Sequence, residues 1–206
     1  MKRALTVSNL LSYTPDLLEF EDEWLRSFGK PECTGSILIY GMPKMGKTSF
    51  ALKFAKYLTR FGSVIYDSIE EGKSQTFKLA VLRENMKEAK QRFHWLNKET
   101  VPELVERLKA RRSPRIIFFD SIQFAELTFK EYKMLKETFP NKLFVFISHV
   151  DGREPDGRAA KRIKRDADVF VYIEGFRAFP EGRYGGGESF DIWPEKAQKY
   201  WNGKLK

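Results

Sequence analysis

The chain has 206 residues, of which 42% are hydrophobic and 32% charged, a balance that is typical of one globular protein rather than a disordered chain. The 37 basic and 28 acidic residues give a net charge of +9, which is compatible with a polyanionic partner without establishing one. Cys33 is the only cysteine, and no apolar stretch is long enough to cross a membrane. We therefore expect a cytoplasmic protein without an internal disulfide or a membrane partner.

Residues 1–35 are predicted to be an entry segment that packs on the edge of the core. The apolar side chains of this segment recur at partly helical spacing, in Leu17, Leu18, Phe20, Trp24, Leu25 and Phe28. The rest of the chain, residues 36–206, is predicted to form a single domain, because no linker, internal repeat or low-complexity tract divides it.

Residues 41–48 are the most informative stretch, and they match the phosphate-binding pattern G-x-x-x-x-G-K-[ST]. An apolar run precedes them, and a helical pattern follows. The two glycines allow a tight curl in which successive N–H groups face an anion, and the dipole of the following helix points to the same place. Lys47 is expected to reach the β- and γ-phosphates, and the Thr48 hydroxyl to ligate Mg²⁺. The predicted nucleotide-binding residues are Gly41, Met42, Pro43, Lys44, Met45, Gly46, Lys47, Thr48 and Ser49.

A second motif is the apolar run of residues 115–120, which ends in Asp120 and has the Walker B pattern. Such a carboxylate, at the carboxyl end of a strand, is expected to hold the hydration shell of Mg²⁺. The pattern is weak alone, but it is more informative when it follows a phosphate loop in the same domain.

Strands and helices alternate over most of the chain. Apolar runs predict strands at residues 36–40, 63–67, 115–120, 143–148 and 169–173, and capping boxes at Thr100 and Thr128 predict helix starts. A last strand at 189–193 is predicted to follow a glycine-rich, hairpin-like loop at 181–187. The order predicts an α/β fold with a mainly parallel central sheet, flanked by helices and extended by antiparallel strands at the C-terminal end.

From about residue 36 to 201, this order resembles the RecA-like P-loop ATPases, and within them the branch that includes RadA and KaiC, in the short single-domain form of phages and mobile elements. Besides the phosphate loop, four stretches carry the resemblance: 64–71 with its paired glutamates, 119–122, 147–150 and 182–185. The last departs from the RadA motif Lys-Asn-Arg-Phe-Gly, because Glu181 replaces the lysine and Gly182 the asparagine.

The resemblance implies that residues 36–206 are an ATPase domain that uses ATP and Mg²⁺. It implies Glu70 as the base that polarises the attacking water, with Glu71 as the alternative, and His149 as a sensor of the γ-phosphate. Arg183 would be an arginine finger that reaches a neighbour's phosphates in a homo-oligomer, a hexameric ring or a filament. Each of these roles has a plainer alternative. The paired glutamates would then be solvated loop acids, the histidine a structural residue at a strand end, and the arginine an ordinary exposed side chain.

In the family, the segment after strand 143–148 faces DNA. Here four basic residues recur at i, i+3, i+4 and i+7, so that on a helix they form one basic stripe: Arg158, Lys161, Arg162 and Arg165. Such a stripe neutralises phosphates without reading sequence, although a solvated helix face is an equal alternative.

The predicted function is therefore an ATP-driven motor on single- or double-stranded DNA, in recombination, repair or replication. One alternative is a nucleotide-gated protein–protein switch or helicase loader of the KaiC type that does not bind DNA. A small-molecule kinase is a third hypothesis, and the chain lacks a recognisable lid-like arginine cluster to support it.

Overall fold

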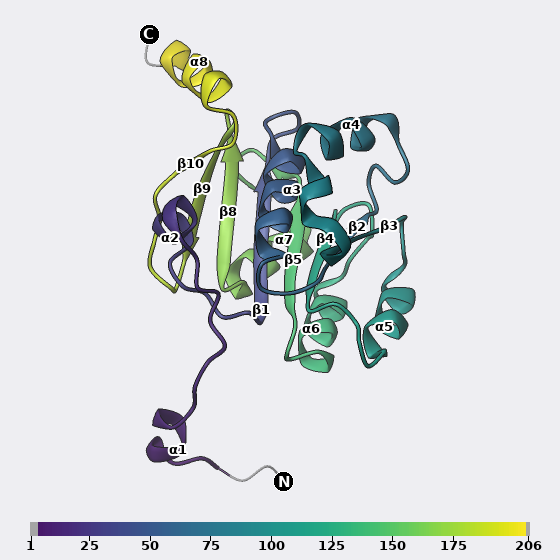
Figure 1. The fold of residues 1–206 in the computed structure, drawn as a ribbon, viewed down its shortest axis with the longest axis vertical. Coiled ribbons are helices and arrows are strands. Elements are labelled where there is room, and N and C mark those ends of the chain that lie inside the picture. The colour runs from purple at the N-terminus through teal and green to yellow at the C-terminus, as the bar shows by residue number, and fades with distance from the viewer. Residues whose placement is uncertain (1–3, 205–206) are drawn as a thin grey trace.

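The computed structural model describes residues 4–204, in which helices cover both faces of one eight-stranded sheet (Figure 1). The sheet strands are β1 (Gly35–Gly41), β2 (Val64–Ser68), β3 (Phe93–Leu96), β4 (Ile116–Asp120), β5 (Leu143–Ser148), β8 (Val169–Glu174), β9 (Arg177–Gly182) and β10 (Phe190–Asp191). A separate hairpin contains β6 (Val150–Asp151) and β7 (Glu154–Pro155).

The helices are α1 (Val7–Leu11), α2 (Asp22–Phe28), α3 (Lys47–Leu58), α4 (Gln75–Arg83), the 3₁₀ helix η1 (Met86–Arg92), α5 (Val101–Lys109), α6 (Phe129–Thr138), α7 (Gly157–Asp166) and α8 (Pro194–Lys204). Within residues 4–204, none of them is long and apolar enough to cross a membrane.

The strand order in the sheet is β10-β9-β8-β1-β5-β4-β2-β3. The six strands from β8 to β3 run parallel, and β9 and β10 are antiparallel to their neighbours. The predicted fold class is thereby confirmed: an α/β fold with a mainly parallel sheet and an antiparallel C-terminal part.

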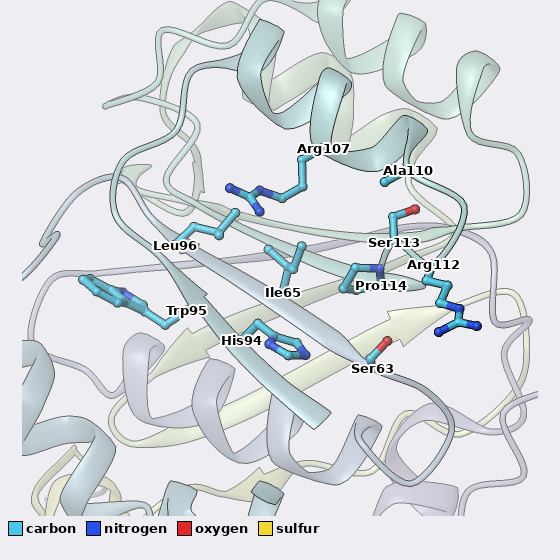
Figure 2. Close-up of a pocket in the computed structure, with 10 residues that line it drawn as sticks. All are labelled: Ser63, Ile65, His94, Trp95, Leu96, Arg107, Ala110, Arg112, Ser113 and Pro114. Carbon is cyan, nitrogen blue, oxygen red and sulfur yellow. The ribbon is translucent and has the colours of Figure 1, made fainter. Parts of the chain in front are cut away.

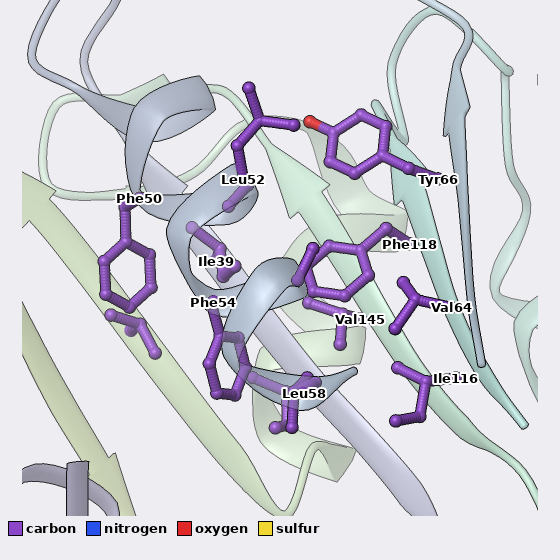
Figure 3. Close-up of a cluster of buried hydrophobic side chains, with 14 of the residues drawn as sticks. Ile39, Phe50, Leu52, Phe54, Leu58, Val64, Tyr66, Ile116, Phe118 and Val145 are labelled. Carbon is purple, nitrogen blue, oxygen red and sulfur yellow. The ribbon is translucent and has the colours of Figure 1, made fainter. Parts of the chain in front are cut away.

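The central parallel strands are buried on both faces, which explains their continuous apolar runs. On one face, α3 packs Phe50, Phe54 and Leu58 against side chains of the sheet (Figure 3). Trp24 of α2 covers the same cluster and stacks on Phe54 with the ring centroids 5.3 Å apart. A second cluster lies on the other face, under α5, α6 and α7.

The entry segment divides into two parts. From Leu18 to Cys33 most of its large apolar side chains, such as Phe20 and Phe28, pack in the cluster under α3, whereas Leu25, also predicted to pack, is 37% exposed. By contrast, α1 contains no buried residue and lies well away from the sheet (Figure 1). The packing predicted for residues 1–35 therefore describes the part that contains α2, and residues 1–3 lie outside the described residues.

The C-terminal strands differ from the prediction. The chain turns directly after β8, at Gly175 and Phe176 with φ of 54° and 61°, and β9 follows at once. The glycine-rich residues 183–187 are not that turn; they connect β9 with the short β10. Pro180 hides β9 in the sequence, and it is tolerated there because β10 pairs only with the first two residues of β9. Helix α8 also has no counterpart in the prediction.

Candidate nucleotide-binding site

The carboxyl ends of β1, β2, β4 and β5 meet at one edge of the sheet. The strand register places Ser68 beside Asp120, and Tyr40 beside Ser148. The loops that follow these ends surround a cavity of about 430 Å³, at the edge where open parallel sheets bind their ligands. The cavity is lined by Pro43, Lys44, Gly46, Lys47, Thr48, Ser49, Glu70, Glu71, Thr76, Arg83, Asp120, His149 and Trp193.

Residues 42–46 form a tight curl between β1 and α3. Lys44 and Gly46 have φ of 62° and 101°, in the region that favours glycine, and Gly46 stands directly before α3. Gly41 is needed for a different reason, because a Cβ there would lie 2.2 Å from the carbonyl oxygen of Ile173 in β8. The first turn of α3 directs its N–H groups and its dipole toward the cavity side of this curl, which is the geometry of an anion site.

Lys47 begins α3, and its side chain folds back over the curl. Its Nζ donates hydrogen bonds to the carbonyl oxygens of Gly41 at 2.8 Å and Met42 at 3.4 Å. Burial lowers the pKa of Lys47, while the nearby carboxylates of Glu70 and Asp120 act in the opposite direction. The ammonium group is thus partly desolvated and held by neutral carbonyls, and phosphate oxygens would give it stronger, charge-assisted partners.

Asp120 is the last residue of β4 and is 5% exposed. Its Oδ2 accepts a hydrogen bond from the Tyr66 hydroxyl at 2.6 Å. Burial raises the pKa of Asp120 to about 7, although the bond from Tyr66 lowers it; the neighbouring Glu70 raises it further. A divalent cation would stabilise the charged form of such a carboxyl group, so the residue fits a metal-binding role.

Glu70 and His149 form a pair at the cavity. His149 Nε2 donates to Glu70 Oε2 at 3.0 Å, and this bond is the main reason that the pKa of Glu70 is lowered. The Glu70 amide donates to the Asp120 carbonyl at 2.9 Å, which ties the loop after β2 to β4. The Glu71 carboxylate instead accepts from the Thr76 hydroxyl at 2.6 Å, at the start of α4. The two adjacent acids therefore have different surroundings.

Gln123, three residues beyond Asp120, was not found by sequence reasoning. Its Nε2 donates to Ser148 Oγ at 2.9 Å and to the Asp156 carbonyl at 2.8 Å, and its Oε1 accepts from the His149 amide at 3.1 Å. One side chain thus joins the loop after β4, the end of β5 and the residue before α7. The only available signal was its position just after the Walker B strand.

Arg83 and Trp193 were also not found. The Arg83 guanidinium lies 4.8 Å from the centroid of the Trp193 ring and donates to Ser49 Oγ at 2.8 Å. They come from the end of α4 and from the segment before α8, so only the folded chain brings them together at the cavity. They add a flat, cationic surface next to the start of α3.

Arg183 does not line this cavity. It directly follows β9, at the opposite end of the sheet, and lies in another cavity beside Gly35 and Asp168 at the amino ends of β1 and β8. The six residues of β9 separate the two ends of the sheet by about 20 Å. A finger role for Arg183 therefore requires the phosphates of a neighbouring chain.

The basic residues of α7 lie outside the cavity on an exposed face of the helix, whereas Ala160 and Ile163 are buried beneath it. The Arg162 guanidinium lies 4.0 Å from the centroid of the Phe129 ring in α6. The exposed stripe consists of Arg158, Lys161, Arg162 and Arg165.

No protein-family model and no curated protein matches the chain. Solved structures do match its fold. The structure of an ATPase domain aligns with a TM-score of 0.58 and 17% identity, over 80% of this chain and 83% of that one. The flagellar accessory protein FlaH from Methanocaldococcus jannaschii aligns with a TM-score of 0.55 and 16% identity, over 86% of this chain and 94% of that one. At these identities the likeness shows the fold alone: an α/β fold with a mostly parallel sheet flanked by helices and an antiparallel C-terminal part.

Proposed function

We propose that this chain is an ATPase that binds ATP with Mg²⁺ in the cavity at the carboxyl ends of the strands. The observation that carries the proposal is that three separate parts of the chain line one cavity beside the curl of residues 42–46: the start of α3 with Lys47 and Thr48, the loop after β2 with Glu70, and the end of β4 with Asp120. The curl and Lys47 fit a triphosphate, and Thr48 and Asp120 offer Mg²⁺ two oxygen ligands.

In this proposal each side chain has one task. Lys47 neutralises charge on the terminal phosphates, and Thr48 and Asp120 hold Mg²⁺, which supplies the positive charge that phosphoryl transfer needs. Glu70 orients the attacking water and accepts its proton, and His149 fixes the direction of the Glu70 carboxylate. Glu71 is the second choice for the base, since it also lines the cavity.

We further propose that the ATPase acts on DNA as a homo-oligomer, in the manner of the RadA/KaiC-like branch, within recombination, repair or replication. The exposed stripe on α7 supports DNA binding. Gln123 supports a link between the two sites, because it bonds both to His149 beside the cavity and to Asp156, the residue before α7.

Nucleotide binding is tested with a fluorescent ATP analogue and with phosphate release. Lys47→Ala is expected to weaken analogue binding at least tenfold and to abolish turnover, because it removes a charge-assisted contact. Lys56→Ala is the matched control, since Lys56 also lies on α3 but contacts Glu84 and Glu88 outside the cavity. Unchanged binding by Lys47→Ala would refute the ATPase proposal.

DNA binding is tested by fluorescence anisotropy with single- and double-stranded oligonucleotides across a salt series, with and without an ATP analogue. Arg158→Glu with Arg165→Glu is expected to weaken binding and to flatten the salt dependence. Arg111→Glu with Arg112→Glu is the control, on the loop after α5. No ATP-dependent binding at low salt would defeat the DNA proposal. ATP turnover that a protein partner raises and DNA leaves unchanged would favour the switch or loader.

A further inference from the structure

Tyr66 of β2 is fully buried and packs in the apolar cluster under α3. The strand register places it beside Phe118 of β4, and the two rings stack with their centroids 5.5 Å apart (Figure 3). Ile65, the preceding residue, points to the opposite face of the sheet, where it lines a cavity of about 500 Å³ between β3 and α5 (Figure 2). The polar end of Tyr66 therefore lies on the side of the sheet that α3 covers, away from this second cavity.

The hydroxyl group of Tyr66 requires a hydrogen-bond partner, because solvent does not reach the side chain. A hydroxyl group that is buried without a partner is costly, and phenylalanine would fill the same space without one. The partner within residues 4–204 is Asp120, whose Oδ2 accepts the hydrogen bond at 2.6 Å. Apolar packing thus accounts for the ring of Tyr66, and the contact with Asp120 accounts for its hydroxyl group.

The ring that carries this hydroxyl group is held by three elements of the fold. Besides Phe118 of β4, Phe77 of α4 and Phe93 of β3 approach it, with their ring centroids 5.6 Å and 6.2 Å from that of Tyr66. Because the interior of a protein is close-packed, a ring that is enclosed in this way keeps one orientation. The hydroxyl group is therefore presented to Asp120 from a fixed point.

The hydrogen bond fixes how the Asp120 carboxylate is turned. The last torsion of an aspartate side chain has broad minima, so a carboxylate that nothing holds can present either oxygen. With Oδ2 held by Tyr66, Oδ1 accepts no hydrogen bond from the residues that the structure describes. Since Asp120 lines the nucleotide cavity together with Thr48, Oδ1 is the oxygen that remains for a cation.

We propose that Tyr66 is a positioning residue for the metal site: it holds Oδ2 of Asp120 and so reserves Oδ1 for Mg²⁺. Hydrogen bonds to metal-binding carboxylates orient the ligand, and their loss typically lowers metal affinity about 10- to 100-fold. In this role Tyr66 acts through Asp120 and touches neither metal nor nucleotide. The inference rests on the part of the proposed function in which Asp120 holds Mg²⁺, and it does not depend on DNA binding or on an oligomer.

The test measures the Mg²⁺ gain, defined as the dissociation constant of the fluorescent ATP analogue in EDTA divided by that in Mg²⁺ at the same pH. Tyr66→Phe keeps the ring and its contacts. It is expected to bind the analogue like the wild type in EDTA, because Lys47 and the curl are unchanged, and to show a Mg²⁺ gain about tenfold smaller. Tyr132→Phe is the matched control and is expected to keep the wild-type gain. Tyr132 is equally buried, on the other face of the sheet, and its hydroxyl group bonds to Ser36 and Asp166.

A Mg²⁺ gain in Tyr66→Phe that equals the wild-type gain overturns the inference. So does an affinity loss that is the same in EDTA and in Mg²⁺, since it would indicate a general effect on packing, and so does an equal loss of the gain in Tyr132→Phe. A wild type that binds the analogue without any Mg²⁺ gain refutes the proposed metal site, and this inference with it. A wild type that does not bind the analogue refutes the ATPase proposal as a whole, so these failures are distinguishable. Circular dichroism on the same samples checks that both variants are folded.

Discussion

Asp120 has a proposed role in metal binding, and its buried carboxylate is expected to lower the free energy of unfolding. The substitution Asp120→Asn tests the effect on stability apart from the metal. The residue is 5% exposed, and burial raises the pKa of its carboxyl group to about 7 from the ordinary value of 3.8. Above pH 7 and without a cation, the folded protein therefore holds a buried carboxylate. Asp120→Asn has the same shape, stays neutral, and keeps an oxygen that accepts the hydrogen bond from Tyr66.

The direction in which the free energy of unfolding changes with pH follows from proton binding. The folded state holds the Asp120 proton more tightly than the unfolded state does, so the free energy of unfolding falls as pH rises from about 4 to about 7. The difference between the ordinary pKa of 3.8 and the pKa of about 7 in the folded protein corresponds to about 4 kcal/mol in the free energy of unfolding. In EDTA, Asp120→Asn is expected to be more stable than the wild type by about 4 kcal/mol at pH 8 and by less than about 1 kcal/mol at pH 4. Urea unfolding followed by circular dichroism measures both.

Asp166→Asn is the control, because Asp166 also accepts a hydrogen bond from a tyrosine, Tyr132, at 2.7 Å. Desolvation raises the pKa of Asp166, but hydrogen bonds from Lys136 and Tyr132 outweigh it and lower the pKa overall. This substitution is therefore expected to destabilise the protein at pH 8. If Asp120→Asn is no more stable than the wild type at pH 8, burial does not dominate at Asp120 and the reasoning is wrong.

The remaining predictions concern turnover. Glu70→Gln is expected to bind the ATP analogue normally and to hydrolyse ATP at least 100-fold more slowly, whereas Glu71→Gln keeps turnover; phosphate release measures both, and the reverse result would make Glu71 the base. Gln123→Leu is expected to lower kcat about tenfold with little change in KM for ATP, because the main chain at His149 loses a hydrogen bond that positions it. Steady-state kinetics that match the wild type would remove Gln123 from the catalytic arrangement.

The parts that the sequence predicted are those that depend on neighbours along the chain. The curl at residues 42–46 follows from glycine spacing, and the parallel strands follow from apolar runs that are buried on both faces. Asp120 could be found because it ends such a run, and parallel strands end at one edge of a sheet. These local patterns were enough to predict that Lys47, Thr48 and Asp120 lie together, and the three residues line one cavity.

The parts that the sequence did not predict depend on contacts between distant segments. Arg83 and Trp193 meet only because α4 and the chain before α8 lie beside the start of α3. Strand β9 was not predicted because it contains Pro180, and proline argues against a strand. The sheet accepts Pro180 because β10 pairs only with Arg177 and Ala178 of β9, which the sequence alone does not reveal. Gln123 is a single polar residue in a loop. Its role depends on hydrogen bonds to three partners that are up to 33 residues away in the sequence.

The network around Gln123 also explains why ATP and DNA binding belong in one proposal. Asp156, the residue before α7, donates its amide to the His149 carbonyl at 2.9 Å, and Gln123 bonds to both residues. A γ-phosphate that competes for the His149–Glu70 pair would act on the strand end to which α7 is tied. In the proposed function, a shift at that point would be passed to α7 through the hydrogen bonds of Asp156 with His149 and Gln123. A coupling of this kind would need no contact between nucleotide and DNA, and it would require the end of β5 to take two positions.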